Sequence, residues 1–306
     1  MPWTLLWILL WPTLASILLG VAAWLVIRRG ARPVLVGRVP AAVVAGIAVL
    51  VMALHPVLGA APLRLDAPTE VWRTLIDSRF ALPLVLGLPA LLPFAVVRPR
   101  PSTPAGALLA PRTWRSFLSS WWLCALLGVF ALILGLTLAA GLASQPNDAG
   151  EYALYAVDFG SGAIGATIYG WHYSLVPSVL WVLLGAATWW TLTRIARPPL
   201  DPAQAADVTD RHLRSANAAR IALGALLLHL EAVVRSLANT SRMTGSFSGS
   251  DDLSFSAGTP FSALTGSLDL LAQVAGVLGL ALWVFTALTA VTVPSAARAA
   301  RTAVRS

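Results

Sequence analysis

Three ionisable residues interrupt one apolar stretch of the sequence, at His229, Glu231 and Arg235. The stretch covers residues 221–237 and follows Arg220, which marks one edge of the bilayer if the stretch spans a membrane. At 1.5 Å per residue, His229 then lies roughly 13 Å and Glu231 roughly 16 Å from that edge, close to mid-bilayer. Ionisable groups at that depth are costly and face protein or water, so they mark a candidate site.

Three interpretations of these residues remain open. In the first, they form part of a pathway for a solute or an ion. In the second, Glu231 and Arg235 form a structural ion pair, because an i,i+4 spacing puts them on one helix face. In the third, the span begins earlier, near Leu213, and the residues lie close to the outer surface. Asp269 begins the next apolar stretch on the outer side and is a candidate partner for Arg235. The candidate pathway therefore comprises His229, Glu231, Arg235, Asp269 and Gln273.

A second group of candidates ends the polar segment 144–173, which contains all four tyrosines of the chain. The group consists of Tyr169, Trp171, His172 and Tyr173. Tyrosine and tryptophan rings favour the membrane–water interface, so the simplest interpretation is an aromatic belt. The alternative is a lid over a cavity that opens to the outside.

The composition indicates the elements that must position these residues. The chain has 306 residues, of which 58% are hydrophobic and 11% charged, whereas a soluble domain carries about 25% charged residues. Seven apolar stretches are each close to the roughly 20 residues that a membrane span needs. They cover residues 3–27, 39–60, 80–97, 117–143, 174–192, 221–237 and 264–293. The expected fold class is an all-α polytopic membrane protein with seven transmembrane helices in the lipid bilayer.

The arginines favour one orientation of these spans. Sixteen of the 21 basic residues, all of them arginine, lie in one alternating set of loops and in the C-terminal segment. The positive-inside rule then places the N-terminus outside and the C-terminus in the cytoplasm. The net charge of +8 does not predict nucleic-acid binding, because the arginines sit in short loops between apolar stretches. The absence of lysine and the abundance of alanine, leucine and valine favour a bacterial plasma membrane.

An internal match predicts how the spans are arranged. Residues 12–35 and 177–200 agree at 11 of 24 positions without a gap, including Pro12 with Pro177 and Gly20 with Gly185. Such a duplication is common in transporters. Pro12 and Pro177 each remove one backbone hydrogen bond, which makes them candidate hinges.

The matched spans, the first and the fifth, run in the same direction. We therefore expect two parallel three-helix bundles joined by a linker helix, a three-plus-one-plus-three plan. It divides a single membrane domain into a first bundle, a cytoplasmic loop with the linker helix, an extracytoplasmic loop and a second bundle. These parts cover residues 1–97, 98–143, 144–173 and 174–306.

The three-plus-one-plus-three order resembles that of the SWEET sugar carriers and their PQ-loop relatives in topology. The chain contains no Pro-Gln dipeptide, and its loops are longer than in that family, so neither functional residues nor a sugar substrate follow from the resemblance. Seven helices with an outside N-terminus also resemble microbial rhodopsins, but the chain has no lysine for a retinal Schiff base.

Small residues and loops lead to further expectations. Ala131, Gly135 and Ala139 recur every four residues in the fourth span and predict close packing against another helix. Ala272 and Gly276 do the same in the seventh span. The outer loop 241–259 is rich in serine and glycine and is expected to be mobile.

The segment from Asp201 to Arg220 leads into the sixth span. Asp201 followed by Pro202 is a favourable helix start. The acid-to-base pairs Asp207/Arg211 and Asp210/Arg214 are spaced i,i+4, which is typical of an exposed helix. The segment is therefore expected to be a solvated extension of the span, or a helix that docks a cytoplasmic ATPase.

These patterns together favour transport. The four histidines have no metal-binding spacing and no nucleophile elbow occurs, so we expect no metal, no cofactor and no enzyme activity. A solute carrier is expected, or the permease subunit of a transporter whose ATPase is a separate chain, because no Walker A motif is present. The alternative is a non-transporting scaffold, sensor or assembly subunit that binds other membrane subunits.

Overall fold

The computed structural model describes residues 2–28, 34–35, 39–58, 68–96, 113–158, 163–197, 204–248 and 254–293. Eight α-helices make up most of this part of the chain. They are α1 (Pro2–Arg28), α2 (Val39–Leu58), α3 (Thr69–Asp77), α4 (Leu82–Ala95), α5 (Ser120–Ala143), α6 (Trp171–Ala196), α7 (Gln204–Ser241) and α8 (Thr265–Val291). Two short 3-10 helices, η2 (Ser78–Phe80) and η3 (Ser262–Leu264), precede α4 and α8.

Among the described residues, six helices are long and apolar enough to cross a membrane, namely α1, α2, α5, α6, α7 and α8. A seventh span is formed if α3 and α4 are counted together, although the chain bends by 62° between them. These helices agree with the expected class of all-α membrane protein, and the predicted number of seven spans is reached only if α3 and α4 form one span. The third predicted stretch began at Phe80, but helical structure begins earlier, at α3.

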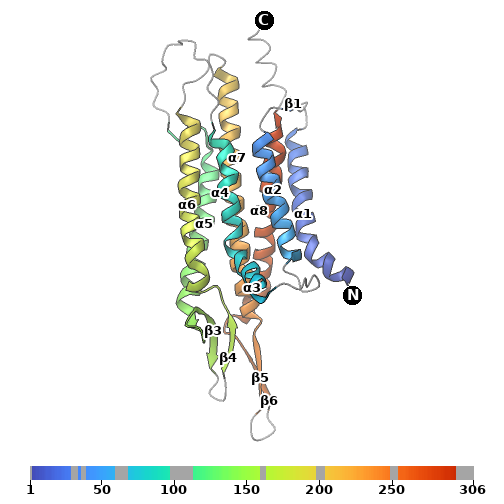
Figure 1. The fold of residues 1–306 in the computed structure, drawn as a ribbon, viewed down its shortest axis with the longest axis vertical. Helices are drawn as coiled ribbons and strands as arrows, with labels where there is room; N and C mark the ends of the chain where they lie inside the picture. The colour runs from blue at the N-terminus through green and yellow to red at the C-terminus, as the bar shows by residue number, and fades with distance from the viewer. Residues whose placement is uncertain are drawn as a thin grey trace.

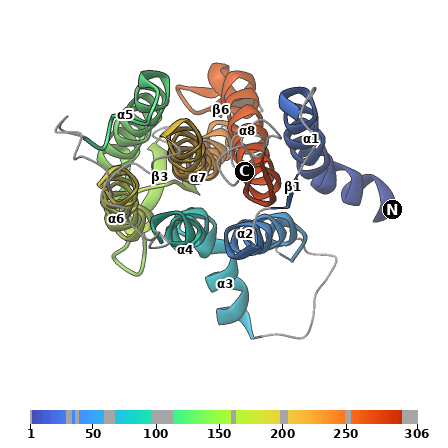
Figure 2. The same cartoon turned by 90° about the horizontal axis from the view of Figure 1, so that it is seen from above.

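The amphipathic helix α3 was not predicted from the sequence. It carries Val71, Trp72 and Ile76 among polar residues, and Val71 and Ile76 are half exposed. Nine residues are too few to span a bilayer. In Figure 2, α3 projects from the bundle below α2 and α4. A search for long apolar stretches passes over such a helix, because its apolar residues lie on one face only.

The long helices run side by side, with α7 at the centre of one half of the bundle (Figures 1 and 2). Of the α7 span, 78% is buried, against 11–17% for the spans in α1, α2 and α5. α7 therefore forms the core of the molecule, and the other three turn most of their surface to the surroundings. The charged residues of α7 are thus placed mainly against protein.

The two halves of the sequence interlock. Helix α8 packs against α1, α2 and α7, and helix α4 packs against α6, α7 and α2. Further contacts join α1 with α2 and α6 with α7, while α5 packs against α7 and α6. Each half of the chain therefore places its last helix against the first two helices of the other half.

The closest helix crossing joins α7 and α8. A Cβ atom at Gly224 would lie 2.5 Å from the Trp283 ring, and a Cβ atom at Gly279 would lie 2.9 Å from the Gly224 carbonyl. The Trp283 indole N–H donates to the backbone carbonyl of Ile221 at 3.0 Å. The predicted small face of the seventh span is part of this crossing, because Ala272 is buried and Gly276 meets the side chain of Glu231.

No helix in the described part of the chain covers the small-residue face of α5. Ala131, Gly135 and Ala139 are exposed, and a Cβ atom at Gly135 would meet no atom within 4 Å. The close packing predicted for this face therefore has no partner among the described residues. The helix turns its larger side chains Ile133 and Leu136, together with Thr137, toward the bundle instead.

Strands lie outside the helices. The 144–173 segment contains an antiparallel sheet of β2 (Gln145–Pro146), β3 (Tyr152–Asp158) and β4 (Ala163–Thr167), with Tyr155 opposite Ala166. The segment expected to be mobile contains the paired strands β5 (Thr244–Ser248) and β6 (Ser254–Gly258). At the other end, β1 (Val34–Leu35) pairs with β7 (Thr292–Val293). We call the end that carries β3–β4 and β5–β6 the hairpin end (Figure 1).

The matched glycines of the sequence repeat have different surroundings. A Cβ atom at Gly20 would lie 2.9 Å from the Ala281 carbonyl and from Val284 in α8, whereas one at Gly185 would meet nothing within 4 Å. Gly20→Ala should therefore lower the melting temperature by the equivalent of about 1–3 kcal/mol. Gly185→Ala is the matched control and should leave it unchanged or raise it. Thermal unfolding of both variants in detergent checks this, and equal losses would contradict the packing described.

Candidate functional site

Two of the predicted pathway residues form an ion pair on α7. The Arg235 Nε donates to a Glu231 carboxylate oxygen at 2.6 Å, in an i,i+4 arrangement. The Arg235 side chain is 49% exposed and that of Glu231 21% exposed, so the pair is only partly enclosed. The Cγ of Glu231 lies 3.0 Å from where a Cβ of Gly276 would be, so a larger residue in α8 would displace the carboxylate.

His229 lies on a different face of α7 from this pair. Its ring is fully buried, and its Nδ1 N–H donates to the backbone carbonyl of Phe80 at 2.7 Å. Within the described part of the chain, the buried Nε2 atom has no hydrogen-bond partner. Phe80 belongs to η2, so His229 holds the bend between α3 and α4. No sequence pattern pointed to this acceptor, because Phe80 is 149 positions away.

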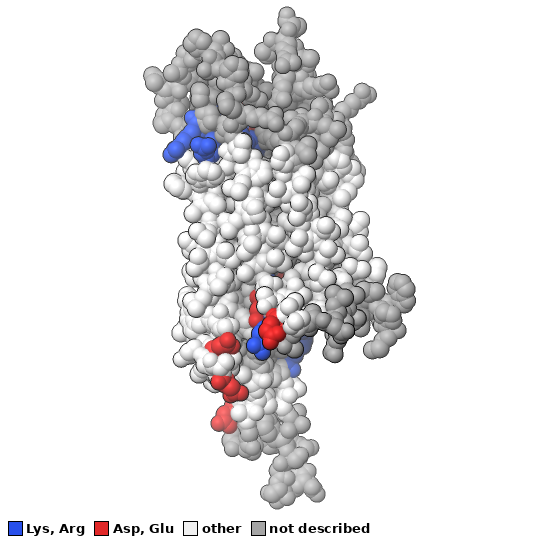
Figure 3. Space-filling model, viewed as in Figure 1, with Lys and Arg blue, Asp and Glu red and all other residues white. Residues whose placement is uncertain are grey.

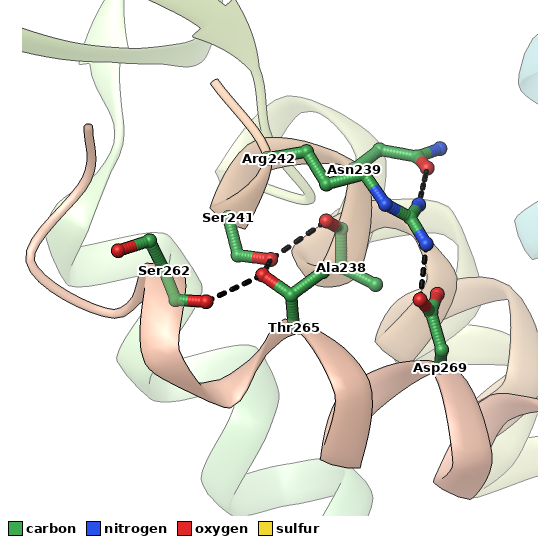
Figure 4. Close-up of polar contacts among 7 residues, drawn as sticks. All are labelled: Ala238, Asn239, Ser241, Arg242, Ser262, Thr265 and Asp269. Carbon is green, nitrogen blue, oxygen red and sulfur yellow. Dashed lines mark hydrogen bonds and ion pairs between the residues drawn. The ribbon is translucent and has the colours of Figure 1, made fainter. Parts of the chain in front are cut away.

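Asp269 does not pair with Arg235. It accepts a hydrogen bond from Arg242, which also donates to Asn239 at 3.1 Å (Figure 4). The predicted pairing of Asp269 with Arg235 is therefore wrong, and the acceptor instead binds an arginine seven residues farther along the chain. Next to it, the hydroxyls of Ser241 and Thr265 are 2.7 Å apart (Figure 4). Gln273 is exposed on α8.

The four side chains of the predicted aromatic group differ in how deeply they are buried. Tyr169 is fully buried and its ring lies 4.7 Å from Phe80 and 6.0 Å from His229, measured between centroids. Burial raises the pKa of the Tyr169 phenol. The Tyr169 ring is therefore part of the protein core and lies outside any aromatic belt.

The remaining members of the aromatic group lie at the start of α6. Trp171 packs on α5, since a Cβ atom at Gly141 would come within 2.8 Å of its ring. Tyr173 is partly buried with its ring 5.5 Å from Phe80. His172 is exposed, and its Nε2 lies 3.8 Å from the Glu151 carboxylate.

The end of the bundle opposite the hairpin end contains two buried arginines on α7, one turn apart. Arg211 donates from Nη1 to the carbonyls of Ile195 and Ala196, at 3.1 and 3.3 Å. Arg214 donates from Nη2 to the carbonyls of Phe94 and Val96, at 2.5 and 3.1 Å. These acceptors lie in the last turns of α6 and α4 and at Val96, the residue that follows α4. Arg211 and Arg214, which we call the arginine clamp, therefore tie the ends of both helices to α7.

The clamp changes the interpretation of the segment before the sixth span. Asp207 accepts hydrogen bonds from Arg211 at 2.8 and 3.0 Å, and both side chains are less than a tenth exposed. The predicted i,i+4 pair is real, but the expectation of an exposed, solvated helix here is wrong. The Nδ1 N–H of His212 also donates to the Phe117 carbonyl at 3.0 Å, which fixes the segment before α5.

The candidate hinges lie inside continuous helices. Pro12 is within α1 and Pro177 within α6, and both helices continue past the proline. In α1, the Ser16 hydroxyl donates to the Pro12 carbonyl at 2.6 Å. Within the described residues, no three His, Cys, Asp or Glu side chains lie close enough together to hold a metal ion.

Comparison with family models, curated proteins and solved structures finds no match to this chain.

Proposed function

We propose that the chain moves a solute across the membrane, as a carrier or as the permease subunit of a transporter driven by a separate ATPase. The main supporting observation is a broken span that meets ionisable residues of another span. The α3–η2–α4 segment bends by 62°, and its Phe80 carbonyl accepts a hydrogen bond from His229. Glu231 and Arg235 follow within two turns on α7. Carriers often build solute and ion sites from discontinuous helices and intramembrane ionisable groups.

The helix contacts support a two-fold relation between the halves of the chain. Exchanging α1 with α6, α2 with α7 and α4 with α8 converts each contact among these helices into another observed contact. The α1–α8 contact becomes α6–α4, α2–α8 becomes α7–α4, α1–α2 becomes α6–α7, and α2–α4 becomes α7–α8. In this proposal the repeat is three-plus-one-plus-three with exchanged last helices, and α5 is the linker. In this proposal, the differing surroundings of Gly20 and Gly185 reflect divergence in packing between the two copies.

Charge distribution supports an orientation with the hairpin end outside. On the face drawn in Figure 3, arginines gather near the end opposite the hairpins, whereas acidic residues gather near the hairpin end. The clamp arginines and Arg194 lie at the former end, where α4 and α6 finish. Under the positive-inside rule that end is cytoplasmic.

In this orientation the clamp is the cytoplasmic gate. Arg211 and Arg214 hold the ends of α6 and α4 on α7, and the β1–β7 pair joins the ends of α1 and α8. These are the helix pairs that the two-fold exchange interconverts. The half-exposed Arg235 lies toward the hairpin end. The arrangement therefore corresponds to a carrier that is closed on the cytoplasmic side.

A distance measurement tests this gate without knowledge of the solute. Spin labels at Val96 and Arg197, both exposed, would report on the ends of α4 and α6 in a Cys124→Ala protein. A carrier in lipid nanodiscs should show two distance populations, and Arg214→Met should enrich the longer one. A single population that Arg214→Met leaves unchanged would argue against a moving gate.

The exposed face of α5 favours a second role, that of a subunit that binds other membrane proteins. Ala131, Gly135 and Ala139 allow close approach of a foreign helix, and they are exposed among the residues that the structure describes. Such a partner is compatible with a permease subunit or with a scaffold. Purification in mild detergent distinguishes the two, because a permease subunit should copurify with an ATPase. Within residues 201–220, a docking ATPase would contact the exposed side of α7 near Thr209 and His212.

A further inference from the structure

Arg79 is a partly buried cation whose Nε atom is fully buried. It belongs to η2, at the bend before α4, and its guanidinium carbon lies 4.6 Å from the centroid of the Phe80 ring. In the described part of the chain, its buried Nε has no hydrogen-bond partner. Leaving a charged donor buried and unpaired costs free energy unless a ligand satisfies it.

A second guanidinium lies on the helix against which η2 packs. Phe80 contacts the α7 turn that includes His229, Ala232 and Val233. Arg235 follows on the next half-turn, and its bond to Glu231 uses Nε. The Arg235 side chain is half exposed, so a ligand can reach it from the surroundings. Asp77, Glu231 and Arg235 all lie close enough to interact electrostatically with Arg79.

Two neighbouring guanidinium groups repel each other, and negative charge nearby lowers this repulsion. Their planar forks match the oxygens of carboxylates and phosphates, with two parallel hydrogen bonds each. Helix α4 begins three residues after Arg79, so the positive end of its dipole lies nearby. The acidic groups Asp77 and Glu231 offset part of this positive charge, which favours a bound oxyanion of low charge.

We propose that Arg79 and Arg235 bind an oxyanion, a carboxylate or phosphate group, at the hairpin end between η2 and α7. This inference rests on the proposed function only in assigning that group to a transported solute. An anionic lipid headgroup carries the same chemistry. Binding itself can be measured without any transport, so the two proposals fail separately.

The test is thermal unfolding of the purified protein in phosphatidylcholine nanodiscs. Inorganic phosphate or succinate replaces chloride at constant ionic strength. The wild-type melting temperature should rise by several degrees with one of these anions. Arg79→Gln and Arg235→Gln should both lose the rise. Arg73→Gln is the matched control, because Arg73 is exposed on α3 six residues earlier, and it should keep the rise.

A further variant and a further lipid composition complete the test. Arg79→Lys keeps the charge without the fork and should reduce the rise, which covers the case in which Arg79→Gln fails to fold. A rise that occurs only when phosphatidylglycerol is added to the nanodiscs, and that still requires Arg79, would assign the site to a lipid headgroup. An equal response of the wild type and Arg79→Gln, or no response to phosphate, succinate or phosphatidylglycerol, would overturn the proposal.

Discussion

Replacing Arg211 with methionine should destabilise the protein by about 3–5 kcal/mol, the usual cost of breaking a buried ion pair. The methionine cannot pair with Asp207, whose side chain is 9% exposed, and it cannot donate to the carbonyls that end α6. The loss should appear as a lower melting temperature in detergent or nanodiscs.

Two further variants sharpen this prediction. Arg194→Met removes an exposed arginine at the same end, beside Trp190, and should cost less than about 1 kcal/mol. Asp207→Asn combined with Arg211→Met removes both charges and should recover part of the loss. If Arg211→Met unfolds at the same temperature as Arg194→Met, the clamp does not hold α6 in the way described.

Replacing Glu231 with glutamine should abolish the proposed transport while the protein stays folded. The partner Arg235 is half exposed, and ion pairs of that kind contribute about 0–1 kcal/mol to stability. The melting temperature should therefore change little. Glutamine keeps the shape of Glu231 but removes its charge. A cysteine on the helix face beside it should then no longer react with an impermeant thiol reagent from both sides of the membrane. Glu70→Gln on the exposed face of α3 is the control.

The structural alternative for Glu231 predicts a different pattern. If the pair mainly stabilises the fold, Glu231→Gln should lower the melting temperature, and Glu231→Gln with Arg235→Met should restore it. A stable Glu231→Gln protein with unchanged accessibility on both sides would remove Glu231 from the candidate pathway.

The helices could be predicted because each apolar stretch carries its own signal. A run of about 20 apolar residues has few alternatives to a membrane span. The helix α3 and the hairpins β3–β4 and β5–β6 were missed for a related reason. Their sequences are short and mixed in polarity, and their pairing depends on turns that apolar periodicity does not detect.

The chemistry of the site was only partly predictable. The i,i+4 pairs Glu231/Arg235 and Asp207/Arg211 follow from spacing on one helix. Their surroundings do not, because burial of Asp207 depends on α4 and α6 ending beside α7. The same limit applies to His229, whose acceptor is a backbone carbonyl at a bend. Spacing also suggested Asp269 for Arg235, although Arg242 is the side chain that reaches it.

The small-residue face of α5 shows that a sequence pattern does not determine which helix packs on it. A repeat of small residues predicts that some helix can approach closely, but it does not state which helix. In α8 the partner is α7 of the same chain, at Gly224 and Gly279. In α5 the face around Gly135 meets no atom of the described residues. Only the three-dimensional arrangement separates these two cases.

The most direct test of the transport proposal uses a single cysteine at Leu227, in a Cys124→Ala protein. Leu227 is partly buried and lies one turn from Glu231 on the same side of α7. An impermeant thiol reagent would be applied to sealed right-side-out and inside-out vesicles. A carrier that alternates between two open states should expose this position from both sides in turn, so labelling is expected in both preparations. Labelling from one side only, or from neither, would contradict alternating access through this helix bundle.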